Sequence, residues 1–244
     1  MDRVIYTAAS AARALMQRQD TVANNLANAA TPGFRSDEVA FRAVPVQGDG
    51  VPTRISAAEV TAGFDDTAGP MQRTGRALDV AIGGQGYFAV LTPDGTEAYT
   101  RAGGFEVAAD GTLTGAAGLP VAGDGGAITI PANANVSIAA DGTVTAQVAQ
   151  GAAQQVGKLK LVNPPASQMH KGGDGLLRTN DGEAAPTDPN VRVTSGTLEG
   201  SNVNAVGAMV DMISAARAFE TQMKLLQSAE QNDQKAAQLL SPNH

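Results

Sequence analysis

The sequence predicts an α+β fold in which one helix at each end of the chain flanks a central all-β domain. Both ends carry apolar residues three and four positions apart, which is the spacing of a coiled-coil seam. The middle is rich in glycine and contains the sequence Asp-Gly-Thr three times. Asp-Gly favours a tight hairpin turn because both residues tolerate a positive φ, and Thr favours the following strand. We therefore expect the two terminal helices to pair as a coiled-coil-like module, with a β-domain between them in the chain.

The first helix is expected to begin near Asp2 and to end at about Ala29, within an N-terminal segment that covers residues 1–34. Its seam consists of Ile5, Ala8, Ala12, Leu15, Gln19, Val22 and Leu26. The sequence Thr31-Pro32-Gly33 follows. Proline disfavours helix at the residue before it and glycine permits a turn, so the helix is expected to stop here.

Three asparagines, Asn24, Asn25 and Asn28, lie near the end of this helix. Asparagine is a poor helix former because its side-chain amide competes for backbone hydrogen bonds. The three residues are therefore either caps of a fraying helix end or a ladder of amides that fixes the register between packed helices, as a buried asparagine does in coiled coils. The spacing leaves both interpretations open.

Residues 35–76 are predicted to form an extended connector, because Pro45 and Pro52 interrupt them and no hydrophobic period persists. A β-domain is expected over residues 77–200, with Asp-Gly-Thr turns at 94–96, 110–112 and 141–143. Its expected strands lie at 78–82, 87–91, 99–101, 105–107, 128–130, 136–138, 144–146, 158–162 and 191–193. Residues 172–189 are expected to form a loop.

Residues 201–244 are expected to form the second helix of the terminal module, with Ser201 or Asn202 as its N-cap. Its seam consists of Met209, Met212, Ala216, Phe219, Met223 and Leu226. Alanines on a seam permit close helix approach, and methionines adapt to non-identical neighbours. The last four residues, 241–244, are expected to fray.

Composition argues against several classes of function. The 244-residue chain has a formal charge of −7 and scattered Lys and Arg residues, which disfavours nucleic-acid binding. It has no cysteine, which removes disulfides, thiol catalysis and thiolate metal sites. The two histidines, His170 and His244, lack a second ligand at a suitable spacing, and each Asp-Gly turn offers one carboxylate where calcium needs several oxygens. We expect no metal site.

Enzyme signatures are also missing from the sequence. The glycine-rich turn at residues 83–86 lacks the spacing and the lysine of a phosphate loop, and the serines lack the context of a nucleophile elbow. No apolar run approaches the roughly 18–20 residues of a membrane span. Residues 2–20 interleave charged and apolar positions, unlike a cleaved secretory signal. We therefore expect no catalytic site, no cofactor, no membrane span and no signal cleavage.

Three motifs resemble those of the flagellar axial proteins, the family of rod, hook and hook-associated subunits. The first is residues 24–28 with Thr31-Pro32-Gly33-Phe34, the second is residues 78–82 with 86–90, and the third is residues 198–203 with 217–220. They occur in the family's order and span nearly the whole chain. Residues 1–8, 41–46 and 52–54 look most like the proximal-rod members. The distal-rod members come second because they carry a longer insertion after the first motif, and hook subunits carry a large second β-domain.

The resemblance implies a structural subunit of the flagellar basal-body rod, which crosses the periplasm and transmits torque. It implies helical assembly with other rod proteins and copies of itself, an inner layer of terminal helices, and passage through the flagellar type III export apparatus. The assembly residues that we derive from the seams and from this resemblance are Ile5, Leu15, Val22, Asn24, Asn25, Leu26, Asn28, Pro32, Gly33, Phe34, Met209, Met212, Ala216, Phe219, Met223 and Leu226.

Two other classes share parts of this pattern. A secreted coiled-coil adhesin would also have helical ends and a β-body, and would form a closed soluble oligomer. A periplasmic enzyme would show a deep pocket lined by polar groups.

Overall fold

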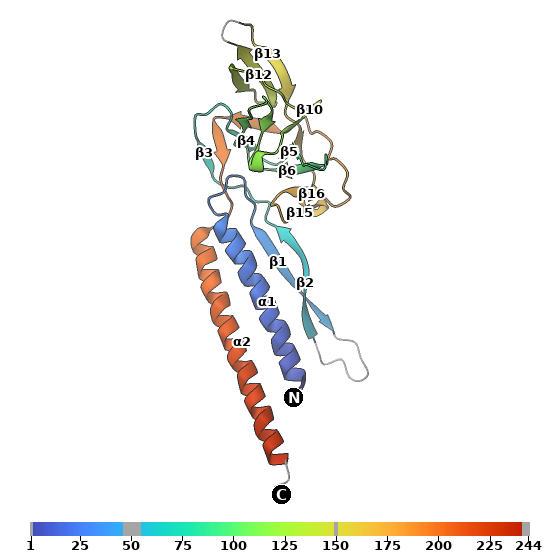
Figure 1. Cartoon of the computed structure of the whole chain (residues 1–244), viewed down its shortest axis with the longest axis vertical. Helices are drawn as coiled ribbons and strands as arrows, with labels where there is room; N and C mark the ends of the chain where they lie inside the picture. Colours follow the sequence, from blue (N-terminus) through green and yellow to red (C-terminus); the bar gives the residue numbers. More distant parts are fainter. Residues whose placement is uncertain (1, 46–54, 149–150, 241–244) are drawn as a thin grey trace. The chain divides into compact units, whose positions relative to one another are not determined.

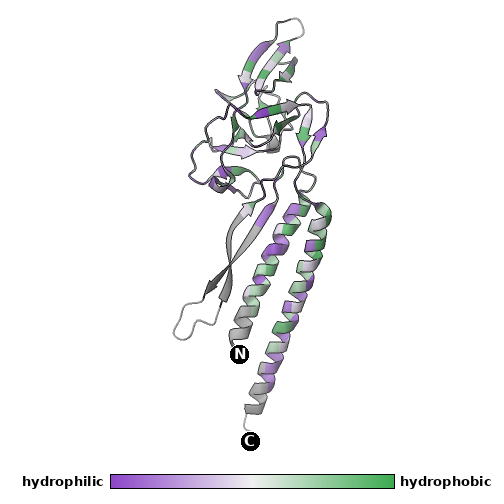
Figure 2. Ribbon diagram, turned by 180° about the vertical axis from the view of Figure 1, so that it is seen from behind, coloured by the Kyte–Doolittle hydropathy of each residue, from purple (hydrophilic) through white to green (hydrophobic). Residues whose placement is uncertain are grey.

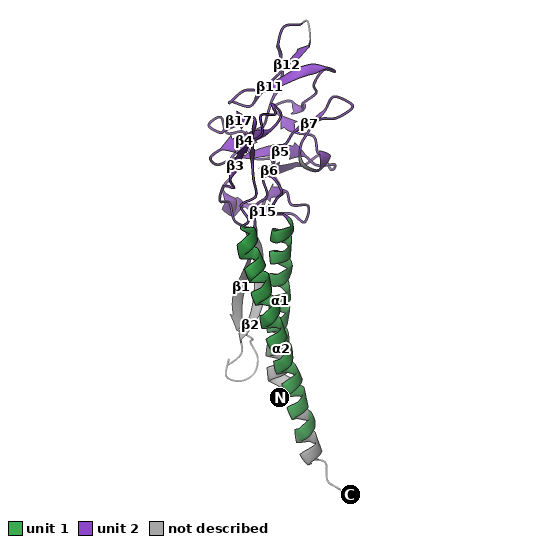
Figure 3. Cartoon of the chain, turned by 90° about the vertical axis from the view of Figure 1, so that its left-hand side faces the viewer, with its two compact units in different colours: residues 1–27, 37–63, 204–244 green, residues 28–36, 64–203 purple. Residues whose placement is uncertain are grey.

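The computed structural model of the chain describes residues 2–45, 55–148 and 151–240. The chain forms two compact units (Figure 3). Unit 1 comprises residues 1–27, 37–63 and 204–244, and unit 2 comprises residues 28–36 and 64–203. Two long helices and a β-rich middle confirm the predicted α+β class.

Unit 1 is built from helices α1 (Asp2–Ala27) and α2 (Ala205–Leu240), which lie side by side (Figure 1). They are antiparallel, because the Arg18 guanidinium lies 3.9 Å from the Asp211 carboxylate while the Gln222 side chain reaches the Ala8 carbonyl. Strands β1 (Asp37–Pro45) and β2 (Ile55–Phe64) form a two-stranded sheet, and β1 contacts α1. The segment predicted as a connector thus contains paired strands. Residues 46–54, with Pro52, and residues 241–244 lie outside the described part.

The ends of the helices differ from the prediction by a few residues. Helix α1 ends at Ala27, two residues before the predicted end. Helix α2 begins at Ala205, and its N-cap is Asn204, whose side-chain oxygen accepts a hydrogen bond from the Gly207 N–H at 3.0 Å. The predicted cap at Ser201 or Asn202 is wrong. The Asn202 amide is instead engaged inside unit 2, where it accepts a hydrogen bond from the Ser36 N–H at 2.8 Å.

Unit 2 consists of short strands and two 3-10 turns. The strands are β3 (Met71–Arg73), β4 (Val80–Gly83), β5 (Tyr87–Leu91), β6 (Glu97–Thr100), β7 (Glu106–Val107), β8 (Leu113–Thr114), β9 (Ala122–Gly123), β10 (Gly126–Ala127), β11 (Ala134–Ile138), β12 (Thr143–Val148), β13 (Gln154–Lys158), β14 (Leu161–Val162), β15 (Met169–Lys171), β16 (Leu177–Thr179), β17 (Arg192–Ser195) and β18 (Thr197–Glu199). The 3-10 turns are η1 (Ala116–Gly118) and η2 (Ala166–Gln168). The largest described sheet has the order β14-β5-β6-β16-β15, and β11-β12-β13 form a second sheet. The remaining described strands pair in twos, including β17 with β4 and β18 with β3.

The core of unit 2 lies on both sides of β5. Four of the five residues of this strand are buried, as expected for a continuous apolar run in a covered sheet. Phe88 packs edge to face on Phe105, with ring centroids 5.2 Å apart, in the larger apolar cluster. Tyr87 and Ala89 point into a second cluster. Strand β5 therefore contributes side chains to both clusters.

Local turn chemistry predicted the hairpins of unit 2 correctly. The three Asp-Gly-Thr sequences connect β5 to β6, β7 to β8 and β11 to β12, and each glycine has a positive φ. The loop predicted at residues 172–189 is wrong in part, because Leu177 is buried and pairs with Tyr99, which makes β16 a strand. The strand predicted at 158–162 is interrupted between β13 and β14.

Candidate functional site

The faces by which α1 and α2 pack together follow a three-four spacing. On α1 the buried and half-buried residues include the predicted seam positions Ala8, Ala12, Leu15, Gln19, Val22 and Leu26. On α2 they include Ala205, Ala208, Met212, Ala215, Phe219, Gln222, Leu226 and Ala229. The Gln222 amide donates a hydrogen bond to the Ala8 carbonyl at 3.3 Å, which places this face of α2 on α1. The side chain of Ile5 lies outside the described part.

The predicted seam residues of α2 divide between two faces. Met212, Phe219 and Leu226 belong to the face that packs on α1. Ala216 is half-buried as well, beside the buried Ala215. Met209 and Met223 are displaced from this face, since they are 51% and 38% exposed. The residues that stand in their place are Ala208, Ala215 and Gln222. Alanine at the contact permits a closer approach of two helices than methionine does, so the packed face is the one with the smaller side chains.

A second apolar stripe lies on α2, outside the face that packs on α1. It consists of Val206, Met209, Val210 and Ile213, which are 51–71% exposed and three or four residues apart. Figure 2 shows hydrophobic positions recurring along both helices. Contiguous exposed apolar residues mark interaction surfaces, whereas scattered ones do not. This stripe, which we call the outer stripe, is therefore a candidate subunit interface.

The asparagine cluster makes hydrogen bonds within the chain. The Asn25 amide bonds the backbone of Asp37 in both directions, donating to its carbonyl at 3.0 Å and accepting from its N–H at 2.8 Å. The Asn24 amide donates to the Asp37 carboxylate at 3.2 Å. The Asn28 side chain accepts from the Thr31 hydroxyl at 3.1 Å. Asn24 and Asn25 thus hold the first residue of β1 beside α1, and whether they also set register between subunits stays a prediction.

The turn after α1 is fixed inside unit 2. Gly33 is buried with φ +69°, and its N–H donates to the Glu199 carbonyl at 2.8 Å. The Phe34 ring lies 3.7 Å from the Lys171 ammonium, which also donates to the Arg35 carbonyl at 2.8 Å. Pro32 is exposed. These contacts join parts of a single subunit, so the role of Pro32, Gly33 and Phe34 in assembly stays a prediction.

Arg35, the residue after Phe34, belongs to a cluster of buried charges. Arg35, Arg101 and Glu199, which we call the buried charge cluster, have side chains that are 3%, 2% and 0% exposed. Each guanidinium places one nitrogen 2.8 Å from a different oxygen of the Glu199 carboxylate. Both contacts are ion pairs at a distance typical of charged groups in direct contact. Asp66 lies at the edge of the cluster, 3.7 Å from Arg35.

Hydrogen bonds to the backbone complete the cluster. Arg101 donates to the carbonyls of Gly84 and Gly86, both at 2.7 Å. Burial lowers the pKa of Arg101, and the Glu199 carboxylate opposes this shift. Burial and a hydrogen bond to Asp66 raise the pKa of Tyr87, whose ring lies 6.0 Å from the Arg101 guanidinium. The cluster is therefore a desolvated electrostatic network inside unit 2.

Sequence reasoning did not find this cluster. Glu199 lies in the third motif, residues 198–203, but a charged residue is ordinarily exposed and nothing local marks it as buried. The ion-pair partners lie far from it in the sequence. One feature of the sequence could have indicated the cluster: the Glu199 carboxylate lies inside a family motif, between a predicted strand and a predicted helix.

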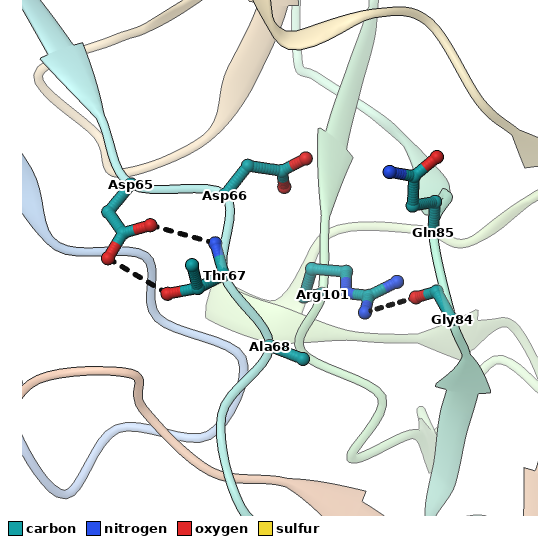
Figure 4. A pocket seen from close by; sticks show the side chains of 7 residues that line it. All are labelled: Asp65, Asp66, Thr67, Ala68, Gly84, Gln85 and Arg101. Carbon is teal, nitrogen blue, oxygen red and sulfur yellow. Dashed lines mark hydrogen bonds between the residues drawn. The ribbon is translucent and has the colours of Figure 1, made fainter.

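An open pocket of about 550 Å³ lies beside the cluster (Figure 4). It is lined by Asp65, Asp66, Thr67, Ala68, Gly84, Gln85 and Arg101. Figure 4 shows Arg101 directed at the Gly84 carbonyl, and the Asp65 carboxylate turned back onto the N–H and hydroxyl of Thr67. These seven described residues include no His, Cys, Ser or Lys. The Asp65 carboxylate and the Arg101 guanidinium are thus engaged by neighbouring groups of the local fold.

Neither a metal site nor a membrane-spanning helix is present among the described residues. In this part of the chain, no three His, Asp or Glu side chains gather where they could hold a metal ion. No described helix combines the length and the apolar character that a membrane crossing requires.

Three segments of the chain, one at each end and one in the middle, match models of flagellar protein families. Residues 5–35 match the family model of the flagella basal body rod protein, residues 81–146 that of the flagellar hook protein FlgE/F/G D1 domain, and residues 194–239 that of the flagellar basal body rod FlgEFG protein C-terminal region. The chain is 48% identical to the flagellar basal-body rod protein FlgF of Escherichia coli K12 and 44% identical to that of Salmonella typhimurium LT2, with 99% of each chain covered. It is 33% identical to the rod protein FlgG of Agrobacterium fabrum, over 94% of this chain and 96% of the relative.

The matches identify the class of protein: a structural protein of the flagellar basal-body rod, and not an enzyme. The paired terminal helices, the apolar outer stripe and the β-rich middle agree with this class. The greater identity to the FlgF proteins than to FlgG separates the two rod classes. The chain belongs to the family of the flagellar basal-body rod protein FlgF.

Proposed function

We propose that this rod subunit occupies the proximal part of the rod and assembles there through α1 and α2, with copies of itself and with other rod proteins. The observation that carries this proposal is the outer stripe of α2. A helix that is apolar on one face packs on one neighbour, whereas α2 is apolar on a second face as well. The first face packs on α1 of the same subunit, which leaves the outer stripe to pack on a different surface of a neighbouring subunit. Head-to-tail contacts of this kind build an open helical array when the rotation between subunits does not close a ring, as a shaft that transmits torque requires.

The composition of the helix contacts supports the same proposal. Among the described side chains of α1 and α2, the buried residues are three alanines, Ala8, Ala12 and Ala215. Each buries little area, and hydrophobic stabilisation scales with the apolar area removed from water. The helix pair therefore gains stability from further apolar neighbours. We infer that the coiled-coil-like pairing of α1 and α2 is completed in the rod, where adjacent subunits cover the outer stripe.

Replacing Val210 by aspartate tests the outer stripe. Val210 is 57% exposed, so the change costs the isolated chain little, within about 0.5 kcal/mol. In an assembled rod the same carboxylate would be buried without a partner, at a cost of several kcal/mol. We expect the variant to keep its melting temperature, to disappear from purified basal bodies and to abolish swimming. Gln227→Asp, at an exposed polar position of the same helix, is the matched control. Normal amounts of the Val210 variant in basal bodies would contradict the proposal.

We also propose that the chain reaches the rod through the flagellar export apparatus without signal cleavage. The amphipathic pattern of residues 2–20 supports this, and so does the lack of cysteine, since no thiol can mispair in an oxidising compartment. N-terminal sequencing of the chain from purified basal bodies is expected to begin at Met1 or Asp2. A first residue later in the chain than Asp2 would overturn the proposal.

A further inference from the structure

Glu199 is the point at which three distant segments of unit 2 meet. Its backbone carbonyl accepts a hydrogen bond from the Gly33 N–H at 2.8 Å, and its carboxylate accepts one from the Gly69 N–H at 3.0 Å. The next residue, Gly200, donates to the Pro70 carbonyl at 2.8 Å. The backbones here are in close contact, because a Cβ on Gly69 would lie 2.1 Å from the Gly200 oxygen. The chain around residue 199 therefore closes over segments that precede it by well over a hundred residues.

The electrostatics of the buried charge cluster make this closure depend on one carboxylate. Arg35 and Arg101 are both buried, and each repels the other, which is one reason why the pKa of Arg101 is lowered. Two guanidinium groups in a low-dielectric interior are costly unless an anion compensates them. The carboxylate of Glu199 lies 2.8 Å from both. Asp66 is farther from Arg35, at 3.7 Å, and is 35% exposed, so it is a weaker partner.

We propose that Glu199 is the closing residue of unit 2, and that the β-domain reaches its closed fold only when the chain through Glu199 is in place. A chain is made from its N-terminus, so Arg35 and Arg101 are present long before their shared counter-ion. Until then, closing unit 2 would bury two cations with only the more distant and partly exposed Asp66 carboxylate to compensate them. The cluster thus acts as a conformational device that keeps an incomplete chain open and closes a complete one. This inference goes beyond the rod function and does not depend on it.

Hydrogen exchange of the full chain tests the proposal with Glu199→Gln, which keeps the shape and removes the charge. If Glu199 controls closure of the whole unit, exchange should rise on the order of 100- to 1000-fold throughout unit 2, including the sheet of β11, β12 and β13. Glu97→Gln is the matched control, because Glu97 pairs with Lys160 at 2.6 Å in the same unit but is partly exposed. Its exchange should rise only near β6. Faster exchange in the Glu199 variant that is confined to residues beside Gly33 and Gly69 would overturn the proposal.

A triple variant separates charge from packing. Arg35→Met, Arg101→Gln and Glu199→Gln together remove all three charges, while the new amide at position 101 stands where the Arg101 Nε now faces residue 199. The triple variant should recover most of the protection that Glu199→Gln alone loses, which is a non-additive result that only coupled residues give. If Glu199→Gln does not fold and the triple variant does, the proposal is supported. If the triple variant is as unprotected as Glu199→Gln, closure does not depend on charge compensation and the proposal is overturned.

Discussion

Replacing Gly33 by alanine is expected to lower the free energy of unfolding of unit 2 by about 2–5 kcal/mol. Gly33 has a φ of +69°, where a residue with a Cβ is strained by about 1–2 kcal/mol. A Cβ at this position would also lie 2.2 Å from the Ala102 nitrogen and 2.3 Å from the Arg101 carbonyl carbon. These are backbone atoms of unit 2, so neither can rotate away, and overpacking of this kind typically costs about 1–3 kcal/mol.

Urea unfolding followed by tyrosine fluorescence measures this loss, because Tyr87 and Tyr99 are buried in unit 2. Gly75→Ala is the matched control. Its φ is +76°, but a Cβ there would meet no atom within 4 Å, so only the backbone strain of about 1–2 kcal/mol applies. If both variants lose the same stability, the contact between Gly33 and the backbone of residues 101–102 is not the cause.

Replacing Phe219 by aspartate is expected to separate α1 from α2 and to abolish motility. Phe219 is half-buried and lies one turn before Gln222, which bonds Ala8, so its side chain belongs to the packed face. An unpaired carboxylate in an apolar contact costs several kcal/mol. Packing of α1 on α2 contributes little free energy, since the buried residues among the described ones are alanines. Unit 2 should remain folded because Phe219 is not part of it.

Limited proteolysis of the purified chain measures the protection of both units in one experiment. In the Phe219 variant the cleavage of α1 and α2 should accelerate at least tenfold, while the fragment containing β3 to β18 resists as in the parent chain. Phe219→Leu is the control, since it keeps an apolar side chain of the packed face and should retain motility. Equal cleavage of the helices in the parent chain and in the aspartate variant would mean that α1 and α2 do not protect one another in the isolated subunit.

The turns and the two terminal helices could be predicted from the sequence because their causes are local. Asp-Gly-Thr specifies a hairpin through the conformations that two adjacent residues tolerate, and all three such turns occur where expected. The three-four spacing specifies a helix with one apolar face without reference to its partner. The family motifs extended these local signals to the class of protein. Strand β16 was missed because its burial depends on β6, which is distant in the sequence.

The packed face of α2 could not be predicted from local sequence alone. On α2 the residues Met212, Phe219 and Leu226 combine at the same spacing either with 209, 216 and 223 or with 208, 215 and 222. The sequence pattern permits both. Packing on α1 selects the flank with the smaller side chains, which leaves Met209 and Met223 exposed. Three-dimensional packing thus decided which face of α2 is free for another subunit.

By itself, the sequence determined the α+β class, the hairpins, the two terminal helices and the family, because each rests on neighbouring residues or on a motif. Only the tertiary structure decided that Asn204 caps α2, that Asn25 holds Asp37, and that Glu199 is buried between Arg35 and Arg101. The physical reason is that a polar or charged side chain carries no local mark of its partner. Its burial becomes favourable only when the fold brings the compensating group within hydrogen-bond or ion-pair distance.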